Sequence, residues 1–396
     1  MKEETSSKVL EDMCSKIYLI GFGNFWYKEP LLSKWKQILY KIYRFSLSLI
    51  FHLIICNEWL EVIFYTFPTD QHRDCLSFAV AQLIVFLKLH IFNKNKDEIN
   101  KLIIEVIEVC KGYEDETLLK KQRRLIKWAT ISQFLVIYSS MSMYALEALR
   151  RYFDGEIFVS IVTYWPKYED QSYFAVTVRI LLIPIMMAMM ATMVFTEMLA
   201  VCNVIIVSFK FVTIIKYFNK IRDEFLTNYA KEEVDIMVLA ETLRDDILKG
   251  VMMHRELLRV INNIDKVFGL VISIQVCQSS GVAVSILIRL EDLTITSIFM
   301  SLFFLSALLI ELALFMCSAG DITYNASLVP DAIFHCGWYL CPMSKQSHKD
   351  LRRIVLMGIL QAQKPVVLKA FGVKDLSYES FVSVLRTTYS VFALFY

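Results

Sequence analysis

Few residues of this 396-residue chain have the types and spacing needed for catalysis or metal binding. His335, Cys336 and Cys341 lie close together, and imidazole and thiolate groups are zinc ligands, but the paired spacing of a zinc site is missing. Gly21-Phe22-Gly23 starts like a dinucleotide-binding fingerprint and does not continue as one. The sequence contains neither a phosphate-binding loop nor a nucleophile elbow. We therefore expect no catalytic residue, no metal, no cofactor and no enzymatic activity.

Composition places the chain among multi-span membrane proteins. Hydrophobic residues make up 56% of it, the mean hydropathy is +0.48, and there are 28 Phe and 19 Tyr. Charged residues still make up 21%, so much of the chain must be helix outside the lipid. The few helix breakers, 11 Gly and 7 Pro, favour an all-α fold. Nine cysteines are an odd number and predict no disulfide framework, and a formal charge of +2 argues against binding nucleic acid.

The apolar stretches predict seven membrane spans. They lie at residues 45–65, 75–93, 129–148, 174–209, 268–288, 293–317 and 377–396. The last stretch is about 30 Å long at about 1.5 Å per residue, which matches a hydrocarbon core, so we expect it to end at the far face of the bilayer. The fourth is too long for one crossing, and we expect a single helix that continues out of the membrane.

Basic residues predict the orientation of these spans. Only six Lys or Arg lie on one side, and 34 of the 42 lie on the other. The excess marks the cytosolic side, so we expect a cytosolic N-terminus without a signal peptide and an extracellular C-terminus. This is the reverse of a G-protein-coupled receptor. The sequon Asn325-Ala326-Ser327 then falls in the cytosol and should be unmodified, whereas the opposite orientation would make it a glycosylation acceptor.

Two cytosolic loops, residues 94–127 and 210–266, are charged but show helical periodicity, which is clearest in the second. Apolar residues recur at helical spacing in two groups: Leu239, Leu243, Ile247 and Val251, and Leu257, Val260, Ile261 and Ile264. They predict cytosolic extensions of the membrane helices that pack on each other, because the apolar stripe would otherwise face water. A solvated helical linker is the alternative.

The C-terminal 75 residues or so carry a recognisable order of motifs. These are Trp338-Tyr339, Ala362-Gln363-Lys364-Pro365, Leu376-Ser377-Tyr378-Glu379-Ser380-Phe381 and Tyr389-Ser390-Val391-Phe392. In this order they resemble the C-terminal signature of the insect odorant receptors. One departure is Val373-Lys374-Asp375, where the family often has Phe-Phe-Pro. The chain lacks the long insertion of the family's co-receptor, so it resembles a ligand-tuning subunit.

The resemblance implies a ligand-gated, non-selective cation channel in the plasma membrane of a sensory dendrite, assembled as a tetramer with the co-receptor. The implied partners are co-receptor subunits, a small volatile apolar ligand, the lipid bilayer and permeant cations. Four regions are expected: a cytosolic N-terminal segment (1–44), spans one to six with their cytosolic extensions and an outer ligand pocket (45–318), a cytosolic anchor region (319–376) and a pore-lining last span (377–396).

The last span offers candidates for the pore. Val384, Thr387, Val391 and Leu394 share one helix face, and in a tetramer that face can form a hydrophobic constriction around the axis. Alignment with the family makes Leu394 the expected gate. Ordinary helix packing or lipid contact is the alternative. Arg386 lies mid-helix and is expected to face the cytosolic vestibule or another subunit, unless it snorkels to the interface.

The implied pocket would be a dry cavity with a few polar groups. Aromatic, Met and small polar residues on the span faces are its candidates. They are Phe78, Gln82, Tyr138, Met141, Ser142, Ala145, Tyr173, Thr177, Ile180, Val276 and Ser280. Plain interhelical packing also explains each of them. A gustatory-type homotetrameric channel and a multipass transporter are the alternative functions, and the absence of an internal repeat weighs against the transporter.

Overall fold

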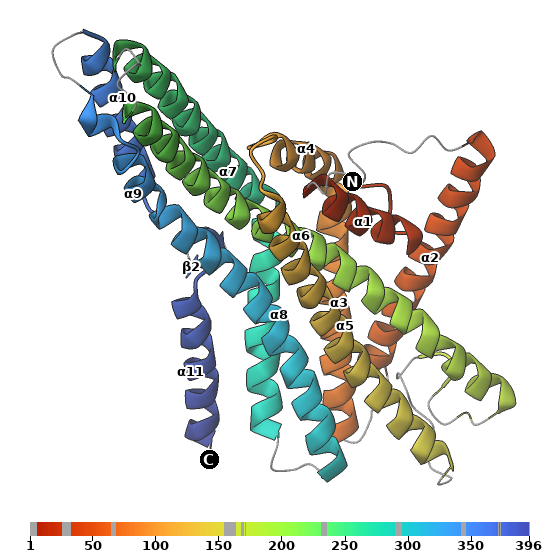
Figure 1. Cartoon of the computed structure of the whole chain (residues 1–396). Helices are drawn as coiled ribbons and strands as arrows, with labels where there is room; N and C mark the ends of the chain where they lie inside the picture. Colours follow the sequence, from red (N-terminus) through yellow and green to blue (C-terminus); the bar gives the residue numbers. More distant parts are fainter. Residues whose placement is uncertain are drawn as a thin grey trace.

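The computed structural model describes residues 6–25, 33–64, 69–153, 164–167, 170, 172–230, 236–289, 295–341, 346–370, 372 and 374–395. Nearly all of them are helical (Figure 1). The elements are α1 (Ser6–Leu19), α2 (Lys34–Phe64), α3 (Thr69–Lys94), α4 (Lys96–Glu108), α5 (Glu116–Phe153), α6 (Tyr173–Tyr229), α7 (Ile236–Arg289), α8 (Ile295–Ser327), α9 (Val329–Phe334), the 3-10 turn η2 (Trp338–Leu340), α10 (Gln346–Ala362), β1 (Lys369–Ala370), β2 (Lys374–Asp375) and α11 (Tyr378–Phe395).

The all-α prediction is confirmed, with one small exception. The described parts of all seven predicted spans lie within helices, namely α2, α3, α5, α6, α7, α8 and α11. Within the described residues, four helices are long and apolar enough to cross a bilayer by length and composition alone. The exception is a two-stranded antiparallel hairpin that pairs Lys369 with Asp375 and Ala370 with Lys374. Its turn includes Gly372 at φ 68°, a backbone conformation that glycine adopts without strain.

The 57-residue helix α6 is the central element of the fold. At about 1.5 Å per residue it is about 85 Å long, almost three times a hydrocarbon core. Its middle is buried on nearly every side, from Met198 to Val207. The prediction of one continuous fourth helix that extends beyond the membrane is thus confirmed, and the other helices pack around it.

The predicted packing of the charged, periodic segment after α6 is also confirmed. Leu243, Ile247, Leu257 and Val260 of α7 are at most 2% exposed and belong to the main hydrophobic core. Here α6 and α7 run side by side with α9 and α10, away from the remaining helices (Figure 1). The solvated-linker alternative is excluded, because the apolar stripe is covered.

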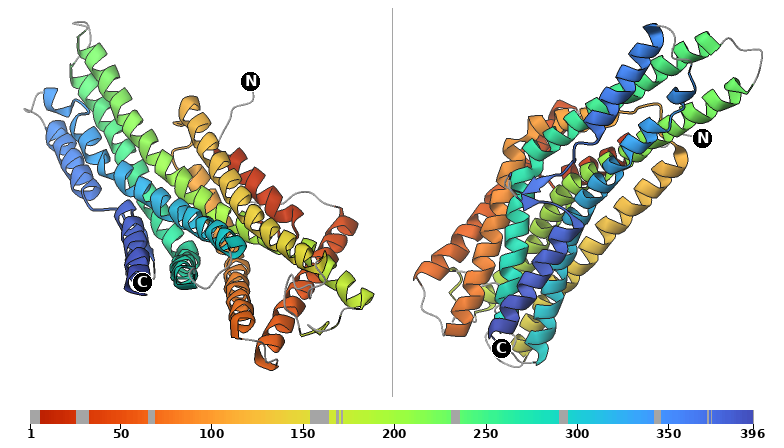
Figure 2. Two further views of the ribbon diagram at one scale, coloured as in Figure 1. Left: turned by 90° about the horizontal axis from the view of Figure 1, so that it is seen from below. Right: turned by 90° about the vertical axis from the view of Figure 1, so that its left-hand side faces the viewer.

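Helix α11 stands at the edge of the bundle. It packs only along one side, against α7 and α8, and its far side is open (Figure 2). Its exposed residues include Val382 at 43% and Tyr389 at 68%. A helix that is apolar on an uncovered face is suited to contact lipid or another subunit.

Candidate functional site

A small methionine-rich cluster lies between α2, α3, α5 and α6, separate from the main core. Its buried members are Phe51 and Ile54 of α2 and Met186 and Met189 of α6, and Met141 of α5 packs against them. Methionine side chains are flexible and polarisable, so they adapt to apolar partners of varied shape. We refer to these five residues as the methionine cluster.

Two predicted pocket residues place polar groups at this cluster. The amide of Gln82 on α3 lies 3.7 Å from the Met186 sulfur and donates to Glu58 Oε1 of α2 at 2.7 Å. The Tyr138 hydroxyl of α5 donates to the Met187 carbonyl at 2.9 Å. An apolar site with a few placed hydrogen-bonding groups has the chemistry of a small-molecule pocket.

The other predicted pocket residues are dispersed. Val276 of α7 is buried, and the Ser280 hydroxyl donates to the Val276 carbonyl at 2.7 Å. Ala145 is half-buried, whereas Ser142, Tyr173, Thr177 and Ile180 are exposed, the last three on the first turns of α6. The Phe78 side chain lies outside the described part of the chain. The structure therefore brings Gln82 and Met141 to the methionine cluster. It places Tyr138 against the main core, hydrogen-bonded to α6 one residue beyond Met186, and it does not bring the α6 candidates to the cluster.

The sequence interpretation missed the two carboxyl groups of α2. Glu58 is 3% exposed and Glu61 is 1% exposed, although both lie in an apolar stretch. Glu58 Oε2 and Glu61 Oε1 have no hydrogen-bond partner among the described residues. An acidic residue inside a span is itself a signal of function, because a carboxyl group is costly in lipid.

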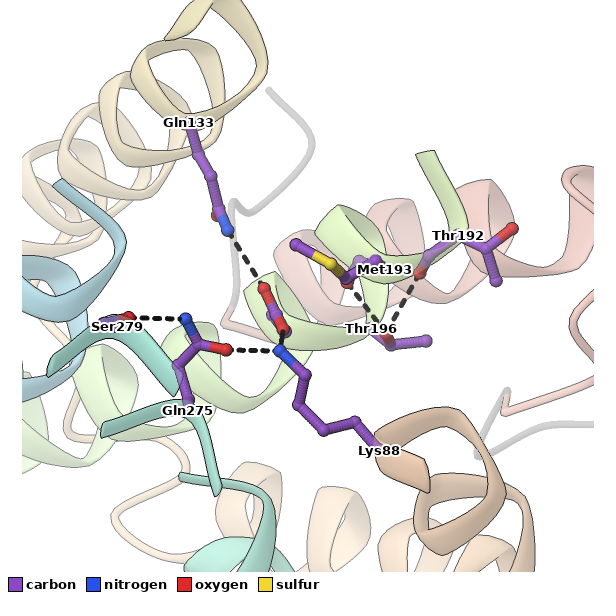
Figure 3. Close-up of polar contacts among 8 residues, drawn as sticks. Lys88, Gln133, Thr192, Met193, Thr196, Gln275 and Ser279 are labelled. Carbon is purple, nitrogen blue, oxygen red and sulfur yellow. Dashed lines mark hydrogen bonds and ion pairs between the residues drawn. The ribbon is translucent and has the colours of Figure 1, made fainter. Parts of the chain in front are cut away.

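A second cluster of buried polar side chains lies farther along the bundle, and Figure 3 shows its members on α3, α5, α6 and α7. The Lys88 ammonium of α3 lies 2.5 Å from Glu197 Oε1 of α6 and also donates to the side-chain oxygen of Gln275 on α7. Gln133 of α5 donates to Glu197 Oε2 at 3.3 Å, and Gln275 donates to the Ser279 hydroxyl at 2.9 Å. Glu311 of α8 is buried beside Glu197 and Gln275.

This buried network ties the helices around the methionine cluster to those that hold α11. Lys88 follows Gln82 along α3 and Glu197 follows Met187 along α6, which separates the network from the cluster by about 9–15 Å of helix. Helices α7 and α8, which contribute Gln275 and Glu311, are also the packing partners of α11. The network thus connects the helices of the methionine cluster with the two helices that pack on α11.

The predicted pore face of α11 is divided in the structure. Val384 is 6% exposed and belongs to the main core, whereas Thr387 is exposed. The buried partner of Val384 one turn on is Thr388, also 6% exposed. Val384 and Thr388 are four residues apart and therefore lie on the same side of α11, which packs against α7 and α8. Val384 is thus not part of the open face of α11. The side chains of Val391 and Leu394 lie outside the described part, and Arg386 is exposed.

The start of α11 is attached to α7 and α8 by polar contacts. The Thr323 hydroxyl of α8 donates to the Val366 carbonyl at 2.8 Å, and the Lys369 N–H donates to Asp265 of α7 at 3.3 Å. Burial raises the pKa of the Asp265 carboxyl group. The Tyr378 hydroxyl donates to Asp321, and the tyrosine ring lies so close to Gly320 that a Cβ there would come within 2.9 Å of it.

Ser377 begins α11 as its N-cap. Its hydroxyl accepts the Ser380 N–H at 3.1 Å, while the Ser380 hydroxyl donates to the Asp375 carbonyl at 2.6 Å. The motif Leu376-Ser377 thus marks a fixed helix start directly after the hairpin.

Comparison with known proteins identifies the family. The family model described as "7tm Odorant receptor" matches residues 73–389. Odorant receptor 2a of Drosophila melanogaster is 29% identical over 165 residues, which are 41% of this chain and 38% of that protein. The insect olfactory receptor OR5 of Machilis hrabei has the same fold, with a TM-score of 0.79 at 11% identity over 98% of this chain and 97% of its own.

The structure of that receptor in complex with eugenol matches with a TM-score of 0.78, also at 11% identity over 98% of this chain and 97% of its own. At such identity the likeness concerns the fold alone. The family match covers most of the sequence, includes the motifs from Trp338 to Phe381, and ends at Tyr389, the first residue of the last motif. It confirms the resemblance inferred from those motifs: the chain belongs to the 7tm odorant receptor family.

Proposed function

We propose that this chain is the ligand-tuning subunit of an odorant-gated, non-selective cation channel. The single observation that carries this function is the family match over residues 73–389, on a fold shared with an insect olfactory receptor. The buried polar groups at the methionine cluster add a place for the ligand. Buried charge pairs such as Lys88–Glu197 also occur in transporters, and the family match favours the channel over a transporter.

The ligand is a small, mostly apolar molecule with a hydrogen-bonding group. It contacts the methionine cluster, with Gln82, Tyr138 and Glu58 positioned to orient its polar end. Phe78, Ala145, Val276 and Ser280 remain candidates for contacts with the ligand, although none of them is a member of the methionine cluster. The exposed candidates Ser142, Tyr173, Thr177 and Ile180 face away from the described subunit interior and would contribute only after rearrangement.

The pore is formed by the last helices of four subunits. Helix α11 has the open face that such an assembly needs, and Thr387 lies on it. Val391 and Leu394 form the hydrophobic constriction that gates by dewetting. Val384 packs inside the subunit and supports α11 against α7 and α8. The described part of α11 carries Glu379 and Arg386 as its only charged residues, which fits weak selectivity among cations.

The partner is the co-receptor of the family, in a heterotetramer in the plasma membrane of a sensory dendrite, with the N-terminus in the cytosol. Exposed apolar residues on α10, Leu356, Met357 and Leu360 at 45%, 61% and 59%, offer a contact surface in the cytosolic region. Such a patch on a region outside the lipid marks a protein–protein interface.

The test is whole-cell recording from cells that express this chain alone or together with the co-receptor, over a panel of volatile compounds. Odorant-evoked cation current only in the co-expressing cells supports a tuning subunit. Robust current from the chain alone refutes it and favours a homotetrameric channel of the gustatory type.

A further inference from the structure

A narrow notch lies between α2 and α3, beneath the loop that follows α1. It has a volume of about 120 Å³, and its polar lining includes Arg44, Ser48, His90 and Asn93. Leu47 and Phe86 line it as well and are apolar. At about 30 Å³ per water molecule this is room for about four waters, enough for a compact anionic group. We refer to this space as the α2–α3 notch.

Arg44 brings an unbalanced positive charge to the α2–α3 notch. Its side chain is half-buried, and its Nη2 donates to the neutral amide oxygen of Asn93 at 2.5 Å. Among the residues that the structure describes, no carboxylate lies within ion-pair distance of Arg44. A partly buried guanidinium usually has an anionic partner, because desolvating it is costly. An anion from outside the chain can supply the missing charge.

The loop after α1 passes close to the Arg44 side chain at one edge of the notch. Gly21 and Gly23 have φ values of +78° and +141°, which other residues adopt only with strain. A Cβ at Gly21 would come within 2.6 Å of the Tyr43 ring, and one at Gly23 within 3.5 Å of the Arg44 Cζ. The Tyr40 hydroxyl of α2 donates to the Tyr18 carbonyl in the last turn of α1 at 3.0 Å, which holds the start of the loop against α2. The glycines of the Gly21-Phe22-Gly23 motif therefore allow the loop backbone to approach the Arg44 side chain closely.

The position of the notch matches the inner surface of a membrane. Arg44 directly precedes the first predicted span, and Asn93 ends the second, so both lie at the predicted cytosolic boundary. On α2 the neighbouring Phe45, Leu49 and Leu53 are 69%, 47% and 59% exposed, as expected of a face in contact with acyl chains. The site is thus cationic at the level of headgroups and apolar at the level of lipid tails.

We propose that the α2–α3 notch binds the headgroup phosphate of an anionic phospholipid from the cytosolic leaflet. Arg44 supplies the charge, and Ser48 and Asn93 supply hydrogen bonds. Basic pockets between membrane helices on the cytosolic side have the chemistry for such headgroups. A soluble phosphate would leave the apolar flank of the notch without a partner. This inference does not depend on odorant binding or on the pore.

The test uses the full-length chain in nanodiscs of phosphatidylcholine with a minor fraction of phosphatidylserine or phosphatidylinositol phosphate, and counts retained lipids by native mass spectrometry. The wild type should retain the anionic lipid preferentially. Asn93→Asp places a carboxylate beside Arg44, and Arg44→Gln removes the charge. Each should lower retention of the anionic lipid about five-fold, which corresponds to the contribution of one basic residue to binding an anionic membrane surface. Whichever anionic lipid is retained better identifies the headgroup.

The matched control is Arg124→Gln, which removes an exposed charge from α5 near the same predicted membrane face but outside the α2–α3 notch, and should lower retention clearly less than Arg44→Gln. Asn93→Asp is nearly isosteric, so it carries the test if Arg44→Gln does not fold. Equal retention of anionic and neutral lipid by the wild type would overturn the proposal. So would an equal loss in Arg124→Gln, or displacement of the lipid by an equal concentration of inorganic phosphate.

Discussion

Replacing Lys88 with methionine should strongly destabilise the chain, because it leaves Glu197 buried without its counter-charge. Lys88 and Glu197 side chains are 2% and 1% exposed, and their charged atoms lie 2.5 Å apart. Methionine has a similar length, so little packing is lost. Removing one partner of a buried ion pair costs about 3–5 kcal/mol, which shifts the unfolding equilibrium by roughly 100-fold to 5,000-fold.

The assay is the fraction of detergent-solubilised protein that survives heating, followed by size-exclusion chromatography. Lys111→Met is the matched control, because Lys111 and Glu108 form a pair of similar length, 2.6 Å, with side chains 62% and 59% exposed. It should cost at most about 1 kcal/mol. The double variant Lys88→Met/Glu197→Gln should recover most of the lost stability. Equal stability of Lys88→Met and Lys111→Met, or a double variant no better than Lys88→Met, would refute a buried, charged pair.

Three further predictions concern the extension of α7, the start of α11 and the gate. Burial lowers the pKa of His254 to about 4 in the folded chain. In the unfolded chain the imidazole binds a proton already below about pH 6.5. The free energy of unfolding should therefore fall by up to about 3 kcal/mol as the pH is lowered from about 6.5 to about 4. Thermal denaturation of His254→Phe should not show this pH dependence. Gly320→Ala should displace the Tyr378 ring and lower the odorant-evoked current per channel at the cell surface. The double variant Gly320→Ala/Tyr378→Ala should restore that current. An unchanged current in Gly320→Ala would show that this contact has no role in gating. Leu394→Ser should raise the basal leak measured without odorant, and unchanged leak and block would exclude Leu394 as the gate.

The sequence was sufficient to predict the helices and the family. Long apolar stretches and a 3.6-residue period are local properties, and they placed the spans and the packed stripe of Leu243, Ile247, Leu257 and Val260 correctly. The short hairpin at Lys369–Asp375 was missed, because two-residue strands leave no periodic signal.

The sequence could not predict which side chains meet. Lys88 was visible inside a span, but its partner Glu197 is 109 residues away, and helix rotation decides whether they face each other. Rotation likewise separates Val384 from Thr387, which a spacing rule places on one face. Glu58 and Glu61 could be recognised as acidic residues in an apolar stretch, but the contact of Glu58 with Gln82 follows only from the packing of α2 on α3.

The most direct test of an odorant-gated channel with α11 in its pore is the reversal potential of odorant-evoked current. It should be recorded under voltage clamp from the co-receptor with either the wild-type chain or Thr387→Asp. A carboxylate at the exposed Thr387 should favour divalent over monovalent cations and shift the reversal potential in a calcium gradient. An odorant-evoked current with the same reversal potential for both would contradict a pore lined by this helix, and no odorant-evoked current from either would contradict the proposed function itself.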